Sequence, residues 1–297
     1  MAIQEGIFPA SMSVLNSNLT LNSQQTLEHA EKLIFSGSTG VVLCGTTGMS
    51  QYLSLEDKIN LIEQASKSSY KQKIIFGPGT NSLLDTVKLI NFAKSKGLTK
   101  FLCQPCAYGW PGIKNKNEAI YAYFSELLNK TGACEIILYN FPNLVQVDFS
   151  IEIIEKLVKN YKNIFVGLKD SGEDDLYKKI KIKNFKVYVG SEKKLLSSLK
   201  SGSSGLISAT VNVHEQIFLA KKVFEDFKEG KNPKHNDKLI KVRSIFDLFH
   251  LTEGLHTFFA EKNSIYKNVI PPLRLLNKKD KVKLFSELEK LNFNIAV

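Results

Sequence analysis

Three side-chain types that can act on a carbonyl group stand at the ends of short apolar segments in this sequence. Lys169 closes the run Ile-Phe-Val-Gly-Leu-Lys, and Tyr139 lies near the end of Glu-Ile-Ile-Leu-Tyr-Asn. Residues 45–48 read Gly-Thr-Thr-Gly and follow the apolar run 41–44. A buried ammonium is costly, so an amine at the end of a buried strand is expected to be neutral and nucleophilic toward carbonyl carbon. These residues predict Schiff-base chemistry.

The companions of Lys169 suit a 2-keto acid. The hydroxyl of Tyr139 both donates and accepts hydrogen bonds, so it can relay protons while a carbinolamine forms and collapses. Thr46 and Thr47, with the backbone amides of a turn that opens at Gly45, can cradle a carboxylate. Each residue also has a structural alternative, namely a lysine that reaches solvent or pairs with Asp170, a core tyrosine and an ordinary turn.

Eight short apolar segments predict strands that are buried on both faces. They span residues 6–10, 41–45, 73–77, 100–104, 135–140, 164–169, 186–190 and 205–209. Helical patterns lie between them at 23–35, 55–66, 83–95, 116–128, 150–159, 174–182 and 192–199. Eight such repeats without a dinucleotide fingerprint favour a (β/α)8 TIM barrel over a doubly wound open sheet. Side chains at the C-terminal strand ends of such a barrel face the reaction site.

Helical patterns continue after the last expected strand, at 223–227, 238–250, 255–260 and 281–291. We therefore expect a catalytic barrel over residues 1–225 and a small helical region over 226–297. Two helix starts have capping residues, Ser54 followed by Asp57, and Ser150. The acids at 173–175 are expected to cap the helix 174–182.

The net charge of +11 comes almost entirely from lysine, since Arg243 and Arg274 are the two arginines. Because specific phosphate recognition favours the arginine fork, and these lysines are scattered, we expect no nucleic-acid partner. The N-terminal residues lack a signal-peptide pattern, and no apolar run approaches the roughly 20 residues of a membrane span. A cytoplasmic protein without a membrane partner is expected. Cys103 and Cys106 have redox-motif spacing but stand at a strand exit, which favours core and wall positions over metal or redox chemistry.

Taken together, the motifs resemble those of the dihydrodipicolinate synthase/N-acetylneuraminate lyase family. The resemblance rests on residues 45–48 (Gly-Thr-Thr-Gly), 139–142 (Tyr-Asn-Phe-Pro) and 167–170 (Gly-Leu-Lys-Asp), with support from 189–191 and 205–208. It implies a (β/α)8 barrel, usually a homotetramer, that condenses or cleaves 2-keto acids through a lysine imine. Lys169 would form the imine, Tyr139 would relay protons with Thr46, and Thr46 and Thr47 would bind the carboxylate. Ile207 would line the pocket.

The departures from the family concern the second substrate. Leu144 stands where the synthase has an arginine that recognises the carboxylate of the aldehyde. The interfacial tyrosine of the family is missing here or is displaced by one residue onto Tyr108, and Met49 stands where most members have a glutamate. Loss of the arginine favours an aldolase for 2-keto-3-deoxy sugar acids, cleaving them to pyruvate and an aldehyde without a metal or organic cofactor. The alternatives are 4-hydroxy-tetrahydrodipicolinate synthase, a dehydratase that uses the same imine, and a non-catalytic keto-acid sensor.

Overall fold

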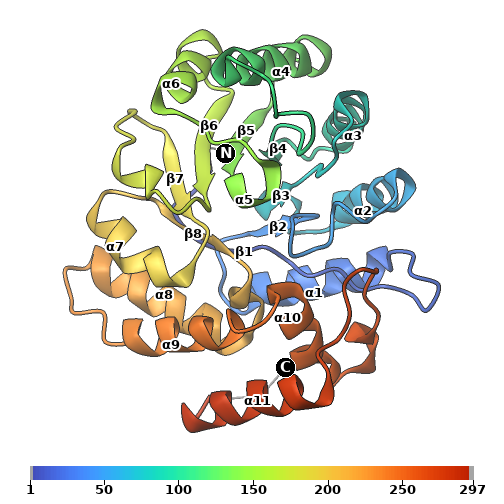
Figure 1. The fold of residues 1–297 in the computed structure, drawn as a ribbon, viewed down its shortest axis with the longest axis vertical. Coiled ribbons are helices and arrows are strands. Elements are labelled where there is room, and N and C mark those ends of the chain that lie inside the picture. The colour runs from blue at the N-terminus through green and yellow to red at the C-terminus, as the bar shows by residue number, and fades with distance from the viewer. Residues whose placement is uncertain (1–2, 294–297) are drawn as a thin grey trace.

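The computed structural model describes residues 3–293, with eight parallel strands at its centre (Figure 1). The strands are β1 (Gly6–Pro9), β2 (Val41–Leu43), β3 (Ile74–Phe76), β4 (Lys100–Cys103), β5 (Glu135–Asn140), β6 (Phe165–Asp170), β7 (Lys186–Val189) and β8 (Gly205–Ser208). Most of their residues are buried because both faces of the sheet are covered. The eight expected strands are confirmed, with ends that differ by one or two residues.

The strands follow one another around a nearly closed barrel. From β2 to β8 each strand pairs with its neighbour in chain order, and β1 pairs with β8. Between β1 and β2 there is one bridge, Ala10 to Val42. The β1–β8 pair is so close that a Cβ on Gly205 would lie 2.0 Å from the carbonyl oxygen of Gly6, so only glycine fits there. The predicted (β/α)8 barrel is confirmed.

Helices alternate with the strands and form the outer ring. They are α1 (Ser23–Phe35), α2 (Leu55–Lys67), α3 (Leu83–Ser95), α4 (Lys116–Thr131), α5 (Pro142–Val145), α6 (Ile151–Asn160), α7 (Leu195–Lys200) and α8 (His214–Lys228). Both expected caps are present, since the side chain of Ser54 accepts from the amide of Asp57 and that of Ser150 from the amide of Ile153. The short α5 was not expected from the sequence.

The prediction of a helix at residues 174–182 is wrong. The structure has only a 3-10 turn there, η2 (Leu176–Lys178), and Asp175 before it has the left-handed φ of +48° and makes no capping hydrogen bond. Its carboxylate instead pairs with Lys178 at 2.6 Å and with Lys194 at 2.7 Å. The carboxylate that was expected to cap a helix therefore forms ion pairs with two lysines instead. The helix expected at 192–199 begins as a 3-10 turn, η3 (Glu192–Lys194), before α7.

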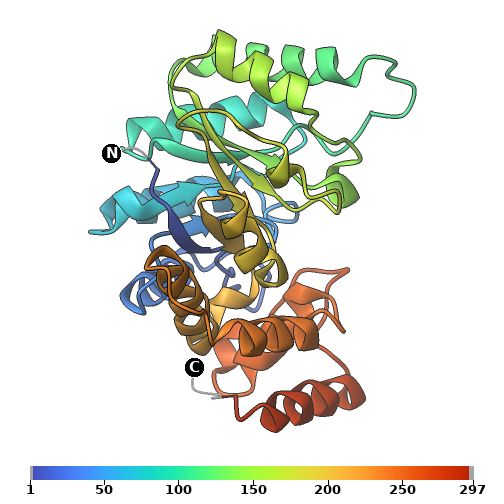
Figure 2. The same ribbon diagram turned by 90° about the vertical axis from the view of Figure 1, so that its left-hand side faces the viewer.

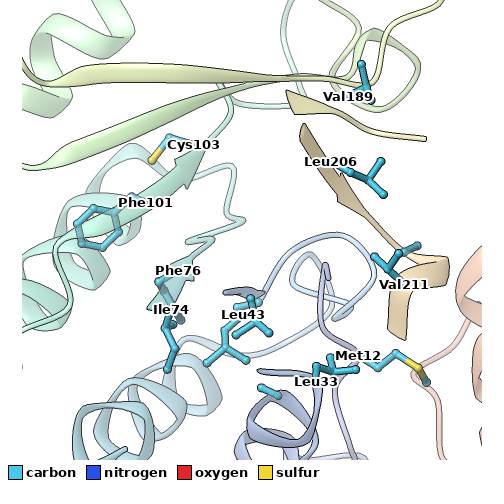
Figure 3. Packing of buried hydrophobic residues seen from close by; sticks show 14 of the residues in the cluster. Met12, Leu33, Leu43, Ile74, Phe76, Phe101, Cys103, Val189, Leu206 and Val211 are labelled. Atoms are coloured by element: carbon cyan, nitrogen blue, oxygen red, sulfur yellow. The ribbon is translucent and has the colours of Figure 1, made fainter. Parts of the chain in front are cut away.

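Two apolar layers position the strands. The outer layer packs strands against helices, and Figure 3 shows Leu43, Phe76 and Phe101 from three consecutive strands within it. The inner layer fills the barrel and consists of Ile3, Phe8, Val42, Ile75, Leu102, Ile137, Tyr139, Tyr188 and Ile207. Tyr139 and Ile207, both predicted site residues, therefore point into the barrel.

The C-terminal helices pack on one side of the barrel, beside α1 and α8 (Figures 1 and 2). They are α9 (Asn236–Phe246), α10 (Leu251–Ala260) and α11 (Lys278–Lys290), with a 3-10 turn η5 (Ser264–Lys267). Helix α8 runs through residue 225, where the division into two regions was expected. Within residues 3–293, no helix combines the length and the apolarity that a membrane crossing requires.

Two buried histidines between the barrel and these helices predict a loss of stability in acid. The ring of His29 lies 2.9 Å from both the hydroxyl of Tyr266 and Oδ1 of Asn212. Burial lowers the pKa of His29 to about 4, and also lowers the pKa of His256 to about 4. An unfolded imidazole titrates at about 6.5, so below that pH the unfolded chain binds protons that the folded chain does not. Stability should fall between about pH 6.5 and pH 4, by up to about 3 kcal/mol per histidine.

Urea unfolding at pH 7 and at pH 4.5 measures this effect. His29→Gln removes one titrating ring and should show a smaller difference between the two pH values than the unchanged protein. His250→Gln, at an exposed position, is the matched control and should behave like the unchanged protein. An equal pH dependence in His29→Gln would contradict the assignment to His29.

Candidate active site

Lys169 and Tyr139 lie side by side at the C-terminal ends of adjacent strands. They are direct partners in the parallel register of β5 and β6. Lys169 is 5% exposed, and its Nζ lies 4.2 Å from the centre of the Tyr139 ring. The C-terminal strand ends are where barrel enzymes place their reacting groups. The pairing expected of these two residues is therefore observed.

Thr46 extends this pair to a third strand end. Its Oγ1 lies 3.3 Å from the hydroxyl oxygen of Tyr139, and either atom can be the donor. The loop after β2 and the end of β5 thus meet through two hydroxyls. An arrangement of this kind can pass a proton between a bound substrate and Tyr139.

The loop at residues 45–48 has free donors for a carboxylate. Within residues 3–293, the amide N–H groups of Thr46, Thr47 and Gly48 have no hydrogen-bond acceptor. The loop is held by Ser13, whose hydroxyl donates to the carbonyl of Gly48 at 2.6 Å. A Cβ on Gly48 would lie 2.9 Å from the carbonyl oxygen of Ser11, so the turn requires glycine there. Successive free amides of a turn are a common basis for anion binding.

Ile207 and Tyr188 complete the interior next to Lys169. Ile207 on β8 is fully buried in the inner layer, and its role in lining a pocket stays a prediction. Tyr188 on β7 is the register partner of Lys169 on the side opposite Tyr139. Its hydroxyl donates to the carbonyl of Gln4 at 2.5 Å, and burial raises its pKa. Sequence reasoning missed Tyr188, although it stands in an apolar strand as Tyr139 does.

Asn140 and Asp170, the residues after Tyr139 and Lys169, tie the two strand ends together. The Asn140 amide donates to Oδ1 of Asp170 at 3.2 Å, and Asp170 also accepts from the amides of Gly172 and Tyr177. The carboxylate of Asp170 is thus engaged with its own loop. In the described part of the chain no salt bridge joins Lys169 to a carboxylate, so the alternative of a Lys169–Asp170 pair is wrong.

Tyr108 is not joined to this group. It is 82% exposed, and among the described residues its hydroxyl makes no hydrogen bond to Thr46 or Tyr139. Trp110 is buried and donates to the carbonyl of Cys106 at 2.7 Å, which makes it an anchor for this loop. Cys103 is a free, buried thiol and Cys106 a free, half-buried one. No group of residues suited to hold a metal ion occurs between residues 3 and 293.

The structure also places Leu144 and Met49, the two other residues that depart from the family motifs. Leu144 lies on α5 and is 42% exposed, with no charge to offer a second carboxylate. Met49 is fully buried and has a φ of +57°. Residue 49 thus contributes an apolar side chain to the outer layer of the core.

A cavity of about 260 Å³ lies beyond the ends of β5 and β6. Its lining includes Asn140, Asp148 and Asp170, together with Lys179 from the following segment. Lys169 does not line it, so an enclosed keto-acid pocket facing Lys169 stays a prediction. Burial raises the pKa of Asp148 in this cavity.

Comparison with known proteins agrees with this geometry. The sequence matches the dihydrodipicolinate synthetase family over residues 4–291. Over 251 residues it is 30% identical to 4-hydroxy-tetrahydrodipicolinate synthase of Agrobacterium fabrum, covering 82% of this chain and 83% of that one. The chain belongs to the dihydrodipicolinate synthetase family. Members of this family are lyases and aldolases that use a lysine Schiff base.

Other relatives are named as synthases or as an aldolase. The chain is 31% identical to 4-hydroxy-tetrahydrodipicolinate synthase of Hydrogenobaculum sp., a match that spans 61% of each protein. It is 25% identical to 2-dehydro-3-deoxy-D-gluconate/2-dehydro-3-deoxy-phosphogluconate aldolase of Picrophilus torridus, covering 77% of this chain and 85% of that one. The crystal structure of dihydrodipicolinate synthase from Aquifex aeolicus has the same fold, with a TM-score of 0.87 at 23% identity over 97% of this chain and 98% of that one.

Proposed function

We propose that this protein is a Schiff-base lyase that condenses or cleaves pyruvate and an aldehyde. The observation that carries the proposal is the Lys169 amine, buried 4.2 Å from the ring of Tyr139, whose hydroxyl is next to Thr46. In the family, a lysine imine activates the keto acid. The free amides of the loop at residues 45–48 can donate hydrogen bonds to the keto-acid carboxylate.

The cleavage reaction proceeds in three balanced steps. First, Nζ of Lys169 attacks the keto carbon, and the carbinolamine hydroxyl leaves as water with a proton from Tyr139, which gives a protonated imine and a phenolate. Second, the electrons of the C–C bond flow into the imine as the phenolate of Tyr139 takes the proton of the substrate hydroxyl, so that an aldehyde leaves and an enamine remains. Third, Tyr139 returns this proton to the enamine carbon, and water then hydrolyses the imine to release pyruvate, the free amine of Lys169 and the neutral phenol. The iminium nitrogen is the electron sink, so these reaction steps require no metal or organic cofactor.

For the second substrate, we favour an aldehyde that completes a 2-keto-3-deoxy sugar acid. Leu144 offers no positive charge to a carboxylate on the aldehyde, whereas a hydroxylated aldehyde requires none. The similarity to the Picrophilus torridus aldolase supports this choice. The similarity to relatives named 4-hydroxy-tetrahydrodipicolinate synthase supports the alternative, in which the aldehyde carries a carboxylate.

A homotetramer is part of the proposal. The exposed ring of Tyr108 is available to a second copy of the chain, where it would take the place of the interfacial tyrosine of the family. We also propose a cytoplasmic location for this lyase.

A panel of aldehydes assayed with pyruvate separates these candidates. We expect D-glyceraldehyde to exceed L-aspartate semialdehyde by at least tenfold in kcat/KM. A missing charge-assisted hydrogen bond costs about 1.5–3 kcal/mol, which corresponds to roughly tenfold or more. Leu144→Arg should reduce the ratio of kcat/KM for D-glyceraldehyde to kcat/KM for L-aspartate semialdehyde. Leu144→Met, which adds no charge, should leave this ratio unchanged.

The opposite preference would establish the synthase activity instead. An imine on Lys169 without turnover of any aldehyde would support the keto-acid sensor. Loss of water from a sugar acid without C–C cleavage would support the dehydratase.

A further inference from the structure

A buried charged cluster joins the C-terminal region to the rim of the barrel. We name it the rim cluster; it consists of Glu192, Ser208, Thr210 and Arg243. Nη1 of Arg243, on α9, donates to Oε2 of Glu192 at 2.6 Å, and its Nε donates to Asp247 at 2.8 Å. Glu192 is fully buried and Arg243 is 8% exposed. The charges therefore interact away from water, where an unpaired charge is strongly disfavoured.

The carboxylate of Glu192 receives hydrogen bonds on both oxygens. Thr210 donates to Oε1 at 2.5 Å, while Ser208 and Arg243 reach Oε2 at 2.8 Å and 2.6 Å. Burial opposes the charge of Arg243, but the carboxylates of Glu192 and Asp247 outweigh it and raise the pKa of Arg243. The guanidinium is thus permanently charged, and its loss would leave Glu192 buried without a counter-charge.

The rim cluster connects to Lys169 through three consecutive strand ends. Ser208 is the last residue of β8 and directly follows Ile207. Its hydroxyl also lies 3.0 Å from the carbonyl oxygen of Gly190, and the amide of Gly190 donates to the carbonyl of Asp170 at 2.7 Å. Asp170 directly follows Lys169 on β6. A hydroxyl has one proton, so Ser208 donates to Gly190 or to Glu192 at any moment, while it accepts from Arg243 at 3.0 Å.

Stability alone does not explain why this cluster is charged. Helix α9 already buries an apolar face, with Leu239, Val242 and Phe246 all fully buried. Replacing a buried ion pair by packed apolar residues is often neutral or stabilising, so such a pair is weak support for a purely stabilising role. Directional hydrogen bonds to Ser208 and Glu192 instead fix where the ends of β7 and β8 lie.

We propose that Arg243 is a positioning residue: through Glu192 and Ser208 it holds the ends of β6, β7 and β8 so that Lys169 and Ile207 keep their places in the active site. The C-terminal region is then part of the framework of the site. The proposal rests on the proposed function for its catalytic meaning. Its structural part, the order of the strand ends, can be measured without any substrate.

Two readouts on three variants test the proposal. The variants are Arg243→Gln, Arg243→Lys, and the control Leu239→Ala, which destabilises the same helix but removes no hydrogen-bonding group of the rim cluster. The first readout is hydrogen exchange of the Gly190 amide in the free protein. The second is the pyruvate concentration that gives half-maximal borohydride-trapped adduct on Lys169, measured well below the melting temperature of every variant.

We expect Arg243→Gln to speed exchange at Gly190 and to raise the half-maximal pyruvate concentration, each by tenfold or more. Arg243→Lys keeps the charge but replaces the two nitrogens that reach Glu192 and Asp247 by a single ammonium, so both values should change by threefold to tenfold. Leu239→Ala should change both values by less than twofold despite a lower melting temperature. If Arg243→Gln does not fold, Arg243→Lys is compared with Leu239→Ala on the same readouts.

Equal effects in the Arg243 variants and in Leu239→Ala would overturn the proposal, because they would reflect stability alone. If the unchanged protein forms no adduct with pyruvate, the proposed function fails. The exchange of Gly190 then still decides whether Arg243 orders the strand ends.

Discussion

Replacing Lys169 with alanine is expected to abolish turnover, with a loss on the order of 10⁴-fold or more, because no other group can take over the covalent step. The amine lies at the end of β6, 5% exposed, against the ring of Tyr139. The measurement is the rate of pyruvate release or consumption with the preferred aldehyde. The same variant should form no adduct when pyruvate and borohydride are added.

Lys100→Ala is the matched control for this variant. Lys100 is also a buried lysine on a barrel strand, but it begins β4 at the opposite end and donates to the carbonyl of Gln72 at 2.7 Å. It should retain turnover even if the protein becomes less stable. Full activity in Lys169→Ala, or equal losses in both variants, would contradict the role of Lys169.

Tyr139→Phe is expected to lower kcat by about 10²–10³-fold while leaving a slow reaction, as is typical when a proton-transfer group is removed. The phenylalanine keeps the ring beside the Lys169 amine and removes only the hydroxyl that meets Thr46 at 3.3 Å. Imine formation should slow in parallel, because carbinolamine formation and collapse both move protons. Stopped reactions with borohydride at successive times measure that rate.

Tyr188→Phe provides the comparison, since Tyr188 flanks Lys169 on the other side. Its hydroxyl donates to the carbonyl of Gln4, away from Thr46, so its removal should leave kcat within about threefold. If both phenylalanine variants lose activity equally, the hydroxyl of Tyr139 has no special role. If Tyr139→Phe is fully active, the proton relay must be assigned to another group.

The parts of this structure that follow local patterns could be predicted from the sequence. The strands are short and apolar because they are covered on both faces, and that pattern is visible without coordinates. Lys169 and Tyr139 stand near the C-terminal ends of neighbouring expected strands, which indicated that they would meet. The capping pair of Ser54 and Asp57 is likewise encoded within four residues.

The parts that depend on distant partners could not be predicted. Asp175 looks like a helix cap in sequence, but Lys194 reaches it from the segment after β7. Glu192 looks like an ordinary first-turn acid, and only the folded chain shows Arg243, 51 residues later, beside it. Asn140 gave no signal of its own, because its partner Asp170 lies on another strand.

Reduction by borohydride in the presence of pyruvate, followed by mass spectrometry of the digested protein, tests the central claim most directly. The account predicts that one pyruvate-derived group becomes attached to the protein and that its peptide places it on Lys169. An unmodified protein at saturating pyruvate, or a group attached to a different lysine, would contradict it.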